Sequence, residues 1–190
     1  MKDISKENII INNQLLPNNV TNDLVLKLFR SVDKEIFFDD LNKNMLYFDE
    51  NFFFNKKRFM LKSSVLGKLL DLVIERRYLK TLNIGPGTGY SSSLLSKISD
   101  TVVSLEEDKS LHEKSKKNFD FLEIKNIQSI NESHYNGYVN LMPYDLIFIN
   151  GCLNQPPNNL INQLDLDSKL ICIENVNINI KKIVKYNKKN

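Results

Sequence analysis

From Leu79 almost to its end, the chain alternates short apolar runs with amphipathic stretches, and this alternation constrains the fold more than any other feature. Strands are expected at residues 81–84, 101–105, 126–130, 145–149, 170–173 and 178–186, and helices at residues 90–98, 109–122 and 158–164. Alternating strands and helices form βαβ units with right-handed crossovers. The sequence therefore predicts an α/β fold with a doubly wound, mostly parallel sheet, whose ligands bind beyond the carboxyl ends of the strands.

The first third of the chain has a different pattern. Apolar residues at helical spacing predict one helix that begins after Thr21 or Asn22 and a second helix over residues 63–77. Residues 37–54 are rich in aromatic side chains without a clean period, which indicates an irregular arm. We therefore expect an N-terminal helical extension over residues 1–60, packed on a core over residues 61–190, in one domain overall.

Composition and charge exclude several classes of protein. Values of 42% hydrophobic and 26% charged residues are ordinary for globular chains and exclude collagen-like and disordered ones. No apolar run approaches the roughly 18 residues of a membrane span, and the first residues are too polar for a signal peptide, so we expect a cytoplasmic protein without membrane contact. The net charge of +3 is scattered, and Cys152 and Cys172 lack zinc-ligand spacing. Neither a nucleic-acid partner nor a metal is expected.

The loop after the first predicted strand reads Asn-Ile-Gly-Pro-Gly-Thr-Gly-Tyr over residues 83–90. Gly85, Gly87 and Gly89 let the backbone approach a ligand closely and expose amide donors at a helix N-terminus. A dinucleotide fingerprint needs a small residue where this chain has Tyr90, and a P-loop needs a Gly-Lys-Ser/Thr sequence that is missing. The spacing is typical of S-adenosylmethionine (SAM) dependent methyltransferases, and the alternative is a tight turn without a ligand.

Acidic and amide side chains follow the neighbouring predicted strands. Glu106 lies about 20 residues beyond the glycine loop, the offset at which an acid meets ribose hydroxyls. The alternative is a solvated acidic cluster that favours the next helix N-terminus. Asn131 and Glu132 end the third strand, where an adenine amine could be met, and Asn150 emerges at the same edge beyond a fully apolar strand.

The remaining reactive side chains have simpler interpretations. His112 is expected on a helix surface and His134 in a solvated loop. Cys152 follows a strand end and could be a nucleophile, but no histidine can be placed beside it, which favours a buried structural thiol. The sequence therefore assigns no catalytic side chain.

Three stretches are similar to the protein-L-isoaspartate O-methyltransferase family, and the likeness covers most of the chain. Residues 81–95, TLNIGPGTGYSSSLL, resemble that family's cofactor loop, including the Tyr after the last Gly, and residues 103–106, VSLE, resemble its ribose strand. Residues 14–26, QLLPNNVTNDLVL, with residues 29–37, FRSVDKEIF, resemble its N-terminal helix and its Val-Pro-Arg-Glu-x-Phe signature. Generic methyltransferases lack this last feature.

The resemblance implies a SAM-dependent enzyme that methylates the carboxylate of isoaspartyl residues in damaged proteins, which is a protein repair reaction. A carboxylate is already ionised at neutral pH, so this reaction needs in-line placement of an oxygen rather than a base. We expect a monomer whose partner is a protein or peptide with isoaspartyl residues. The expected cofactor-binding residues are Asn83, Gly85, Gly87, Gly89, Tyr90, Glu106, Asn131 and Asn150.

The chain also departs from the family pattern. The family has a Thr-Ile-Ser-Gln-Pro segment that supplies hydroxyls at the active site, and a gapless alignment places Phe59 and Leu61 at the hydroxyl positions. Asn83 replaces the acid usual at the end of the first strand, and the tail has room for one strand after Val176 where the family has two. The alternatives are a SAM methyltransferase with another substrate, or a degenerate SAM-binding module that regulates or scaffolds a partner.

Overall fold

The change of apolar period near Leu79 lies close to a boundary in the structure. The structure is a computed structural model that describes residues 6–177 and 180–188. Backbone contacts divide the chain into two compact units, one up to Arg76 and one from Arg77 onward. The helix that begins at Ser63 therefore lies in the first unit, whereas the sequence analysis placed it in the core over residues 61–190. The expected division at residue 60 stays a prediction about domains.

Short helices and turns make up most of the first unit. Its elements are α1 (Lys6–Ile10), a π-helical turn (Ile11–Leu15), α2 (Asp23–Arg30), 3-10 turns (Leu16–Asn18, Lys34–Phe37 and Asp40–Tyr47), β1 (Phe52–Phe53), β2 (Phe59–Met60) and α3 (Ser63–Asp71). Asn22 caps α2 as expected, because its side chain accepts a hydrogen bond from the Leu24 N–H at 3.0 Å.

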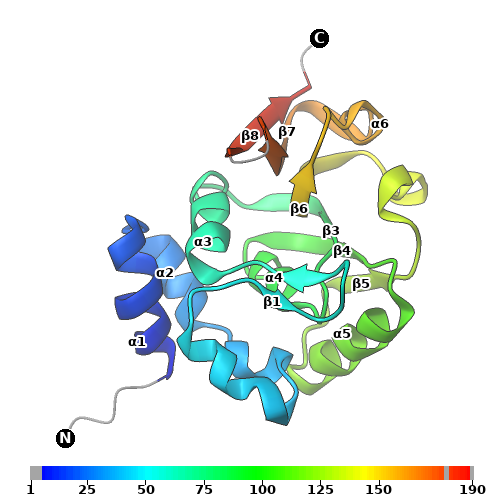
Figure 1. Ribbon diagram of the computed structural model, residues 1–190. Coiled ribbons are helices and arrows are strands. Elements are labelled where there is room, and N and C mark those ends of the chain that lie inside the picture. Colours follow the sequence, from blue (N-terminus) through cyan, green and yellow to red (C-terminus); the bar gives the residue numbers. More distant parts are fainter. Residues whose placement is uncertain (1–5, 178–179, 189–190) are drawn as a thin grey trace, which may run out of the picture. The chain divides into compact units, whose positions relative to one another are not determined.

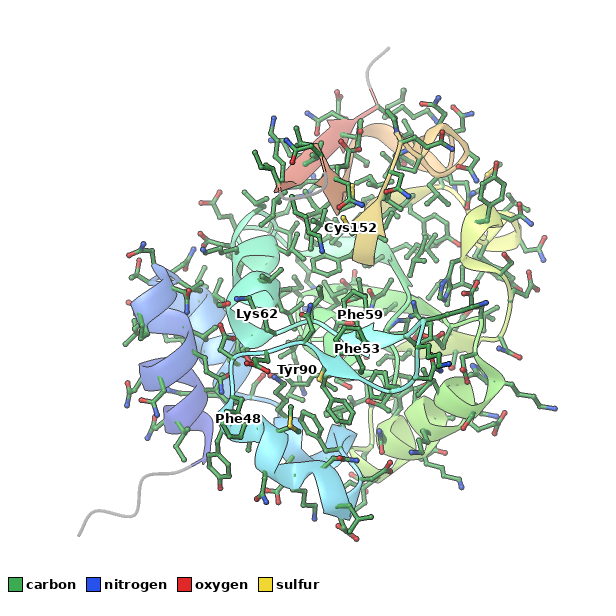
Figure 2. The ribbon with its side chains drawn as sticks, viewed as in Figure 1. Phe48, Phe53, Phe59, Lys62, Tyr90 and Cys152 are labelled. Atoms are coloured by element: carbon green, nitrogen blue, oxygen red, sulfur yellow. The ribbon has the colours of Figure 1, made fainter. Side chains whose placement is uncertain are left out.

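Two features of the first unit differ from the sequence expectation. Helix α3 begins at Ser63 as expected but ends at Asp71 rather than at residue 77. The expected irregular arm, residues 37–54, contributes β1 to an antiparallel hairpin whose second strand, β2, lies beyond the arm. Figure 2 shows Phe53 and Phe59 on these two strands, and their ring centroids are 5.5 Å apart. Each strand of this hairpin has only two residues, which is too short for an alternating pattern to be recognised in the sequence.

The second unit is built around a six-stranded sheet (Figure 1). Its elements are β3 (Tyr78–Ile84), α4 (Tyr90–Leu95), β4 (Ser99–Leu105), α5 (Lys109–Phe121), β5 (Ile127–Ile130), β6 (Tyr144–Leu153), α6 (Asn158–Ile161), β7 (Leu164–Asn175) and β8 (Lys181–Asn187), with 3-10 turns at His134–Asn136 and Val139–Leu141. The strand order is β5-β4-β3-β6-β7-β8. All neighbours pair in parallel except β7 and β8. The predicted doubly wound, mostly parallel α/β sheet is confirmed.

The strand order places a ligand site at one position of the sheet. From β3 the chain moves outward to β4 and β5, and then returns to β6 on the opposite side of β3. Ligands of doubly wound sheets bind at this reversal, beyond the carboxyl ends of the strands. The loops that follow β3, β4, β5 and β6 are therefore the ones that can meet a ligand.

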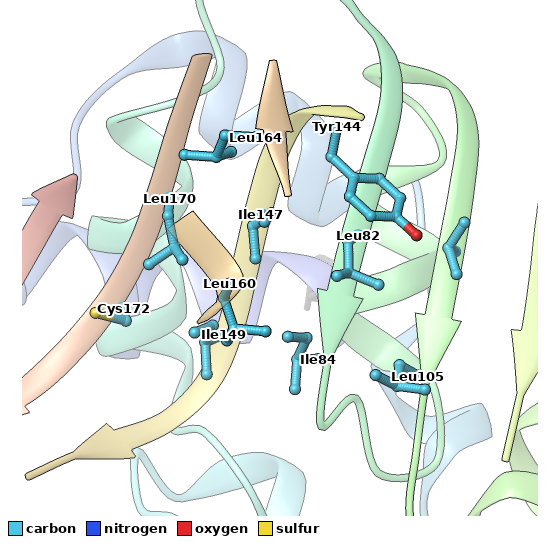
Figure 3. Close-up of a cluster of buried hydrophobic side chains, with 11 residues drawn as sticks. Leu82, Ile84, Leu105, Tyr144, Ile147, Ile149, Leu160, Leu164, Leu170 and Cys172 are labelled. Carbon is cyan, nitrogen blue, oxygen red and sulfur yellow. The ribbon is translucent and has the colours of Figure 1, made fainter. Parts of the chain in front are cut away.

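A hydrophobic core fixes these strands against one another. Leu82, Ile84, Leu105, Ile147, Ile149 and Leu170 pack together in one cluster, with Tyr144, Leu160, Leu164, Val103 and Cys172 (Figure 3). Strands β3, β4, β6 and β7 contribute almost all of these side chains, as expected of central parallel strands. Such a close-packed core holds the strand ends rigidly, which gives the site its precision.

Within the described residues after Val176, the chain forms one strand, as expected. Strand β8 pairs with β7 over seven residue pairs, and it forms the edge of the sheet among the residues described. The start of the expected strand, Ile178, lies outside the described residues. In the described part of the chain, no helix combines the length and the apolar character that crossing a membrane requires.

One lysine is buried within the first unit. Lys34 is 3% exposed, and its Nζ donates to the Ser63 Oγ at 2.8 Å. Burial lowers the pKa of the Lys34 ammonium to about 8, and the Asp49 carboxylate opposes this shift. Because burial penalises the charged form, Lys34 links the stability of the unit to pH.

We expect the free energy of unfolding to rise between about pH 8 and about pH 10.5, because the unfolded chain keeps the lysine proton there while the folded chain releases it. The difference in pKa corresponds to on the order of 3 kcal/mol. Urea unfolding of the wild type and of Lys34→Met over this range measures it. The variant should be the more stable protein at neutral pH and should lose this part of the pH dependence. A constant difference between the two proteins at every pH would contradict the assignment.

Candidate cofactor site

The glycine loop joins β3 to α4 in a tight backbone path. The Gly85 N–H donates to the Leu105 carbonyl at 2.9 Å, and the Gly89 N–H donates to the Pro86 carbonyl at 3.1 Å. Gly87 has φ 61° and Gly89 has φ 102°, both in the left-handed region. A Cβ on Gly89 would lie 2.5 Å from the Phe119 Cε1. Only glycine satisfies both the dihedral angle and the packing at position 89.

Glu106 lies against this loop. Its Oε2 accepts a hydrogen bond from the Gly87 N–H at 2.8 Å, and its Oε1 accepts one from the Asp108 N–H at 3.1 Å. The Glu106 side chain is 1% exposed, which contradicts the alternative of a solvated acidic cluster. Asp108 caps α5 instead, because its Oδ1 accepts from Ser110 and Leu111. A buried carboxylate thus lies next to a glycine loop, although its contact with a ribose stays a prediction.

Asn83 and Asn150 belong to a buried amide and hydroxyl network. The Asn83 amide makes hydrogen bonds of 2.9 and 2.7 Å with the Ser91 and Ser92 hydroxyls, and it lies 2.6 Å from the Asn150 amide nitrogen. Asn150 also donates to the Ile84 carbonyl at 3.1 Å. Asn83 is fully buried, and its amide links β3 to the start of α4 and to β6. The network therefore holds together the elements on either side of the glycine loop, β3 and α4. Direct contact of Asn83 or Asn150 with the cofactor stays a prediction.

The other two expected site residues also lie at this edge of the sheet. Asn131 follows β5, and its Nδ2 donates to the Glu106 carbonyl at 2.7 Å and to the Glu107 carbonyl at 3.2 Å. Tyr90 is the first residue of α4 and is fully buried. Asn131 therefore joins the β5–β6 loop to the segment after β4. The cofactor roles of Asn131 and Tyr90 stay predictions.

The structure corrects the expectations for both histidines. His134 is not a solvated loop residue, because its side chain is 17% exposed and its Nε2 accepts from the Glu107 N–H at 3.0 Å. His112 is not on the surface, because it is 7% exposed and its Nδ1 lies 3.1 Å from the Ser129 Oγ. Burial lowers the pKa of His112, so its imidazole is neutral at neutral pH. The sequence could not predict the contact of His134 with Glu107, because the two residues are 27 positions apart in the chain.

Cys152 has no feature of an activated nucleophile. It is partly buried, and its Sγ donates to the Asn175 Oδ1 at 3.0 Å. Burial raises the pKa of the thiol, which keeps it protonated and unreactive at neutral pH. Among the residues that the structure describes, no group of three His, Cys, Asp or Glu side chains could hold a metal ion.

These features fit a nucleoside-containing ligand at the edge of the sheet. The glycine loop follows β3 at the carboxyl edge of the sheet, and the buried Glu106 carboxylate lies beside it, at the position where doubly wound folds place an acid for ribose hydroxyls. Tyr90 follows the third glycine where a dinucleotide-binding loop requires a small residue. This strand, loop and helix with an acid at the end of the adjacent strand define the class of SAM-dependent methyltransferases.

The comparison with protein families names the family. A model of the protein-L-isoaspartate(D-aspartate) O-methyltransferase family matches residues 5–190. The chain therefore belongs to the protein-L-isoaspartate O-methyltransferase family, as its sequence motifs indicated.

Curated relatives support this membership. A protein-L-isoaspartate O-methyltransferase of Photobacterium profundum is 25% identical over 152 residues, which cover 80% of this chain and 73% of that protein. The enzyme of the same name from Burkholderia lata is 29% identical over 163 residues, which cover 83% of this chain and 51% of that protein. The chain thus spans about half the length of the Burkholderia relative.

Solved structures share the fold. A structure named protein-L-isoaspartate O-methyltransferase superposes with a TM-score of 0.79 at 22% identity, over 97% of this chain and 60% of that chain. A structure from Plasmodium falciparum, described as a protein-L-isoaspartate O-methyltransferase in complex with S-adenosyl-L-homocysteine, has a TM-score of 0.81 at 20% identity, over 97% of this chain and 90% of that chain.

Proposed function

We propose that this chain binds SAM at the candidate cofactor site and transfers a methyl group to the carboxylate of isoaspartyl residues in proteins. The observation that carries the proposal is the buried Glu106 carboxylate, held 2.8 Å from the Gly87 N–H in a strand-loop-helix unit of this family. Bound SAM supplies an electrophilic methyl group on a sulfonium. Methylation of an isoaspartyl carboxylate is the first step of protein repair.

The chain's own residues have binding and positioning roles in this reaction. Glu106 accepts hydrogen bonds from the ribose hydroxyls, and the glycine loop lets the backbone approach the cofactor closely. The network of Asn83, Ser91, Ser92 and Asn150 keeps the loop in place. No residue has to act as a base, because the isoaspartyl carboxylate is ionised at neutral pH with a reference pKa of about 4. Catalysis then depends on placement, which can lower a barrier by roughly 7 to 11 kcal/mol.

The family resemblance predicts two substrate-binding hydroxyls, but this chain has Phe59 and Leu61 at the two positions. Leu61 is 5% exposed in the first unit, and the Phe59 ring packs near the Phe53 ring. Ser63 is the nearest hydroxyl along the chain, and its Oγ accepts a hydrogen bond from Lys34. The Ser63 side chain is 0% exposed, so its hydroxyl does not replace the two missing hydroxyls at a substrate.

Two measurements test the proposed function. Calorimetry with S-adenosyl-L-homocysteine and with NAD should show binding of the first ligand only. Transfer of labelled methyl groups should be detected on an isoaspartyl peptide and not on the same peptide with ordinary aspartate. Tight NAD binding would refute the interpretation of the glycine loop. Cofactor binding without transfer to the isoaspartyl peptide would refute the proposed substrate.

Leu61→Ser should raise turnover of the isoaspartyl peptide. A missing orienting donor costs about 10² to 10³ in rate, so the wild type should be a slow enzyme at saturating SAM. Leu61→Ala is the matched control, because it shortens the same side chain without adding a hydroxyl. We expect Leu61→Ser to exceed Leu61→Ala by at least about fivefold in kcat. Equal rates for the two variants would show that position 61 does not face the substrate.

We further infer that the chain acts in the cytoplasm as a monomer. Both cysteines are free thiols, and Cys172 is buried, as is usual for proteins of reducing compartments. Light scattering of the purified protein tests the oligomeric state, and a dimer mass would contradict the inference.

A further inference from the structure

The β5–β6 loop is attached to the turn that carries Glu106. His134 lies in the 3-10 turn His134–Asn136 of this loop, and its Nε2 accepts from the Glu107 N–H at 3.0 Å. The His134 Nε2 also lies 3.5 Å from the Glu106 Oε1. Asn131 binds the same turn from the start of the loop, through the Glu106 and Glu107 carbonyls. Two side chains from one loop therefore hold the peptide group that joins Glu106 to Glu107, His134 at its N–H and Asn131 at its carbonyl.

The hydrogen bond from the Glu107 N–H selects one tautomer of the neutral His134 ring. An imidazole nitrogen accepts a hydrogen bond only when it carries no proton, so in the neutral ring the proton is on Nδ1. The Nδ1 lies 3.6 Å from the Glu107 Oε2, where this proton faces a carboxylate. Nε2 therefore does not donate to the Glu106 Oε1. Glu106 keeps its carboxylate directed by two backbone N–H groups, from Gly87 and Asp108.

This arrangement has a consequence for the cofactor. The Glu107 N–H in the turn after β4 has its hydrogen-bond partner in a side chain 27 residues away in the chain. Without that acceptor, the N–H needs water as its partner, and the peptide, which Asn131 still binds at its carbonyl, tilts toward solvent. The Glu106 carboxylate would then lose its fixed direction toward the ribose hydroxyls.

We propose that His134 is a positioning residue for the cofactor, which acts by accepting the Glu107 N–H at Nε2 and thereby fixes the Glu106 carboxylate for the ribose hydroxyls. This inference rests on the proposed function, because it requires a ribose at Glu106. The probe is S-adenosyl-L-homocysteine, measured by calorimetry, so no turnover is needed.

The test compares two replacements of His134. His134→Leu fills similar space without an acceptor, whereas His134→Gln keeps an acceptor oxygen near the place of Nε2. We expect affinity to fall about tenfold in His134→Leu and less than threefold in His134→Gln, with unchanged urea midpoints. Tyr135→Ala is the matched control in the same turn, since Tyr135 is 73% exposed, and its affinity should equal that of the wild type.

A double-mutant cycle with Glu106→Gln separates positioning from general stability. If His134 acts through Glu106, His134→Leu should cost no further affinity in the Glu106→Gln background. Additive losses, or equal affinities of His134→Leu and wild type, would overturn the proposal while leaving the proposed function intact. A wild type that does not bind S-adenosyl-L-homocysteine would overturn both.

Discussion

Gly89→Ala is expected to destabilise the second unit by about 2 to 5 kcal/mol. An L-residue at φ 102° is strained by roughly 1 to 2 kcal/mol. The added Cβ would also lie 2.5 Å from the Phe119 Cε1 and 3.2 Å from the Ser115 Cβ, and Phe119 is 4% exposed. A buried ring that must move costs a further 1 to 3 kcal/mol or so. Urea unfolding followed by circular dichroism measures the loss.

Two further variants show whether packing is the cause. Gly151→Ala is the matched glycine control, because a Cβ there meets nothing within 4 Å and its φ lies outside the left-handed region. Its stability should be equal to that of the wild type or slightly greater. Phe119→Leu should recover part of the stability lost in Gly89→Ala, since it removes ring atoms from the clash. If Gly89→Ala were as stable as Gly151→Ala, the described path of the loop would be wrong.

The sequence predicted those features that depend on residues close together in the chain. The alternation of apolar runs predicted all six strands of the large sheet. The signal was clearest for β6, whose residues 146–149 are all apolar and buried, as expected of a central parallel strand. The spacing of Gly85, Gly87 and Gly89 and the offset to Glu106 predicted which loops meet, because successive parallel strands end at the same edge. Local chemistry and topology together were sufficient for this much of the site.

Contacts between distant residues could not be predicted in the same way. His134 binds Glu107 through a pairing of two loops, and a lone loop histidine has no periodic signal. The burial of Lys34 depends on its Ser63 partner from another element, whereas a lysine in a sequence suggests an exposed side chain. The early end of α3 at Asp71 was also missed, because Leu72 and Val73 continue the apolar pattern into a turn.

Gly87→Val is expected to lower the affinity for S-adenosyl-L-homocysteine by at least about 10² to 10³. Gly87 has φ 61°, a conformation that a β-branched residue hardly ever adopts. The peptide must therefore rotate, which removes the Gly87 N–H from the Glu106 Oε2. Without this anchor the Glu106 carboxylate is misdirected for its proposed charge-assisted hydrogen bonds to the two ribose hydroxyls, each worth about 1.5 to 3 kcal/mol. Each 1.4 kcal/mol or so corresponds to a factor of ten in affinity, and calorimetry measures the change.

Gly87→Asn is the control that separates backbone conformation from steric obstruction. Asparagine adopts the left-handed region far more readily than valine, so the Gly87 N–H can stay on Glu106. If backbone conformation dominates, Gly87→Asn should retain much more affinity than Gly87→Val, although the two side chains are similar in size. If both variants lose binding equally while their urea midpoints stay the same, the side chain itself blocks the ligand. Full affinity in Gly87→Val would place the cofactor away from this loop, because neither the N–H to Glu106 nor close backbone approach would then be needed.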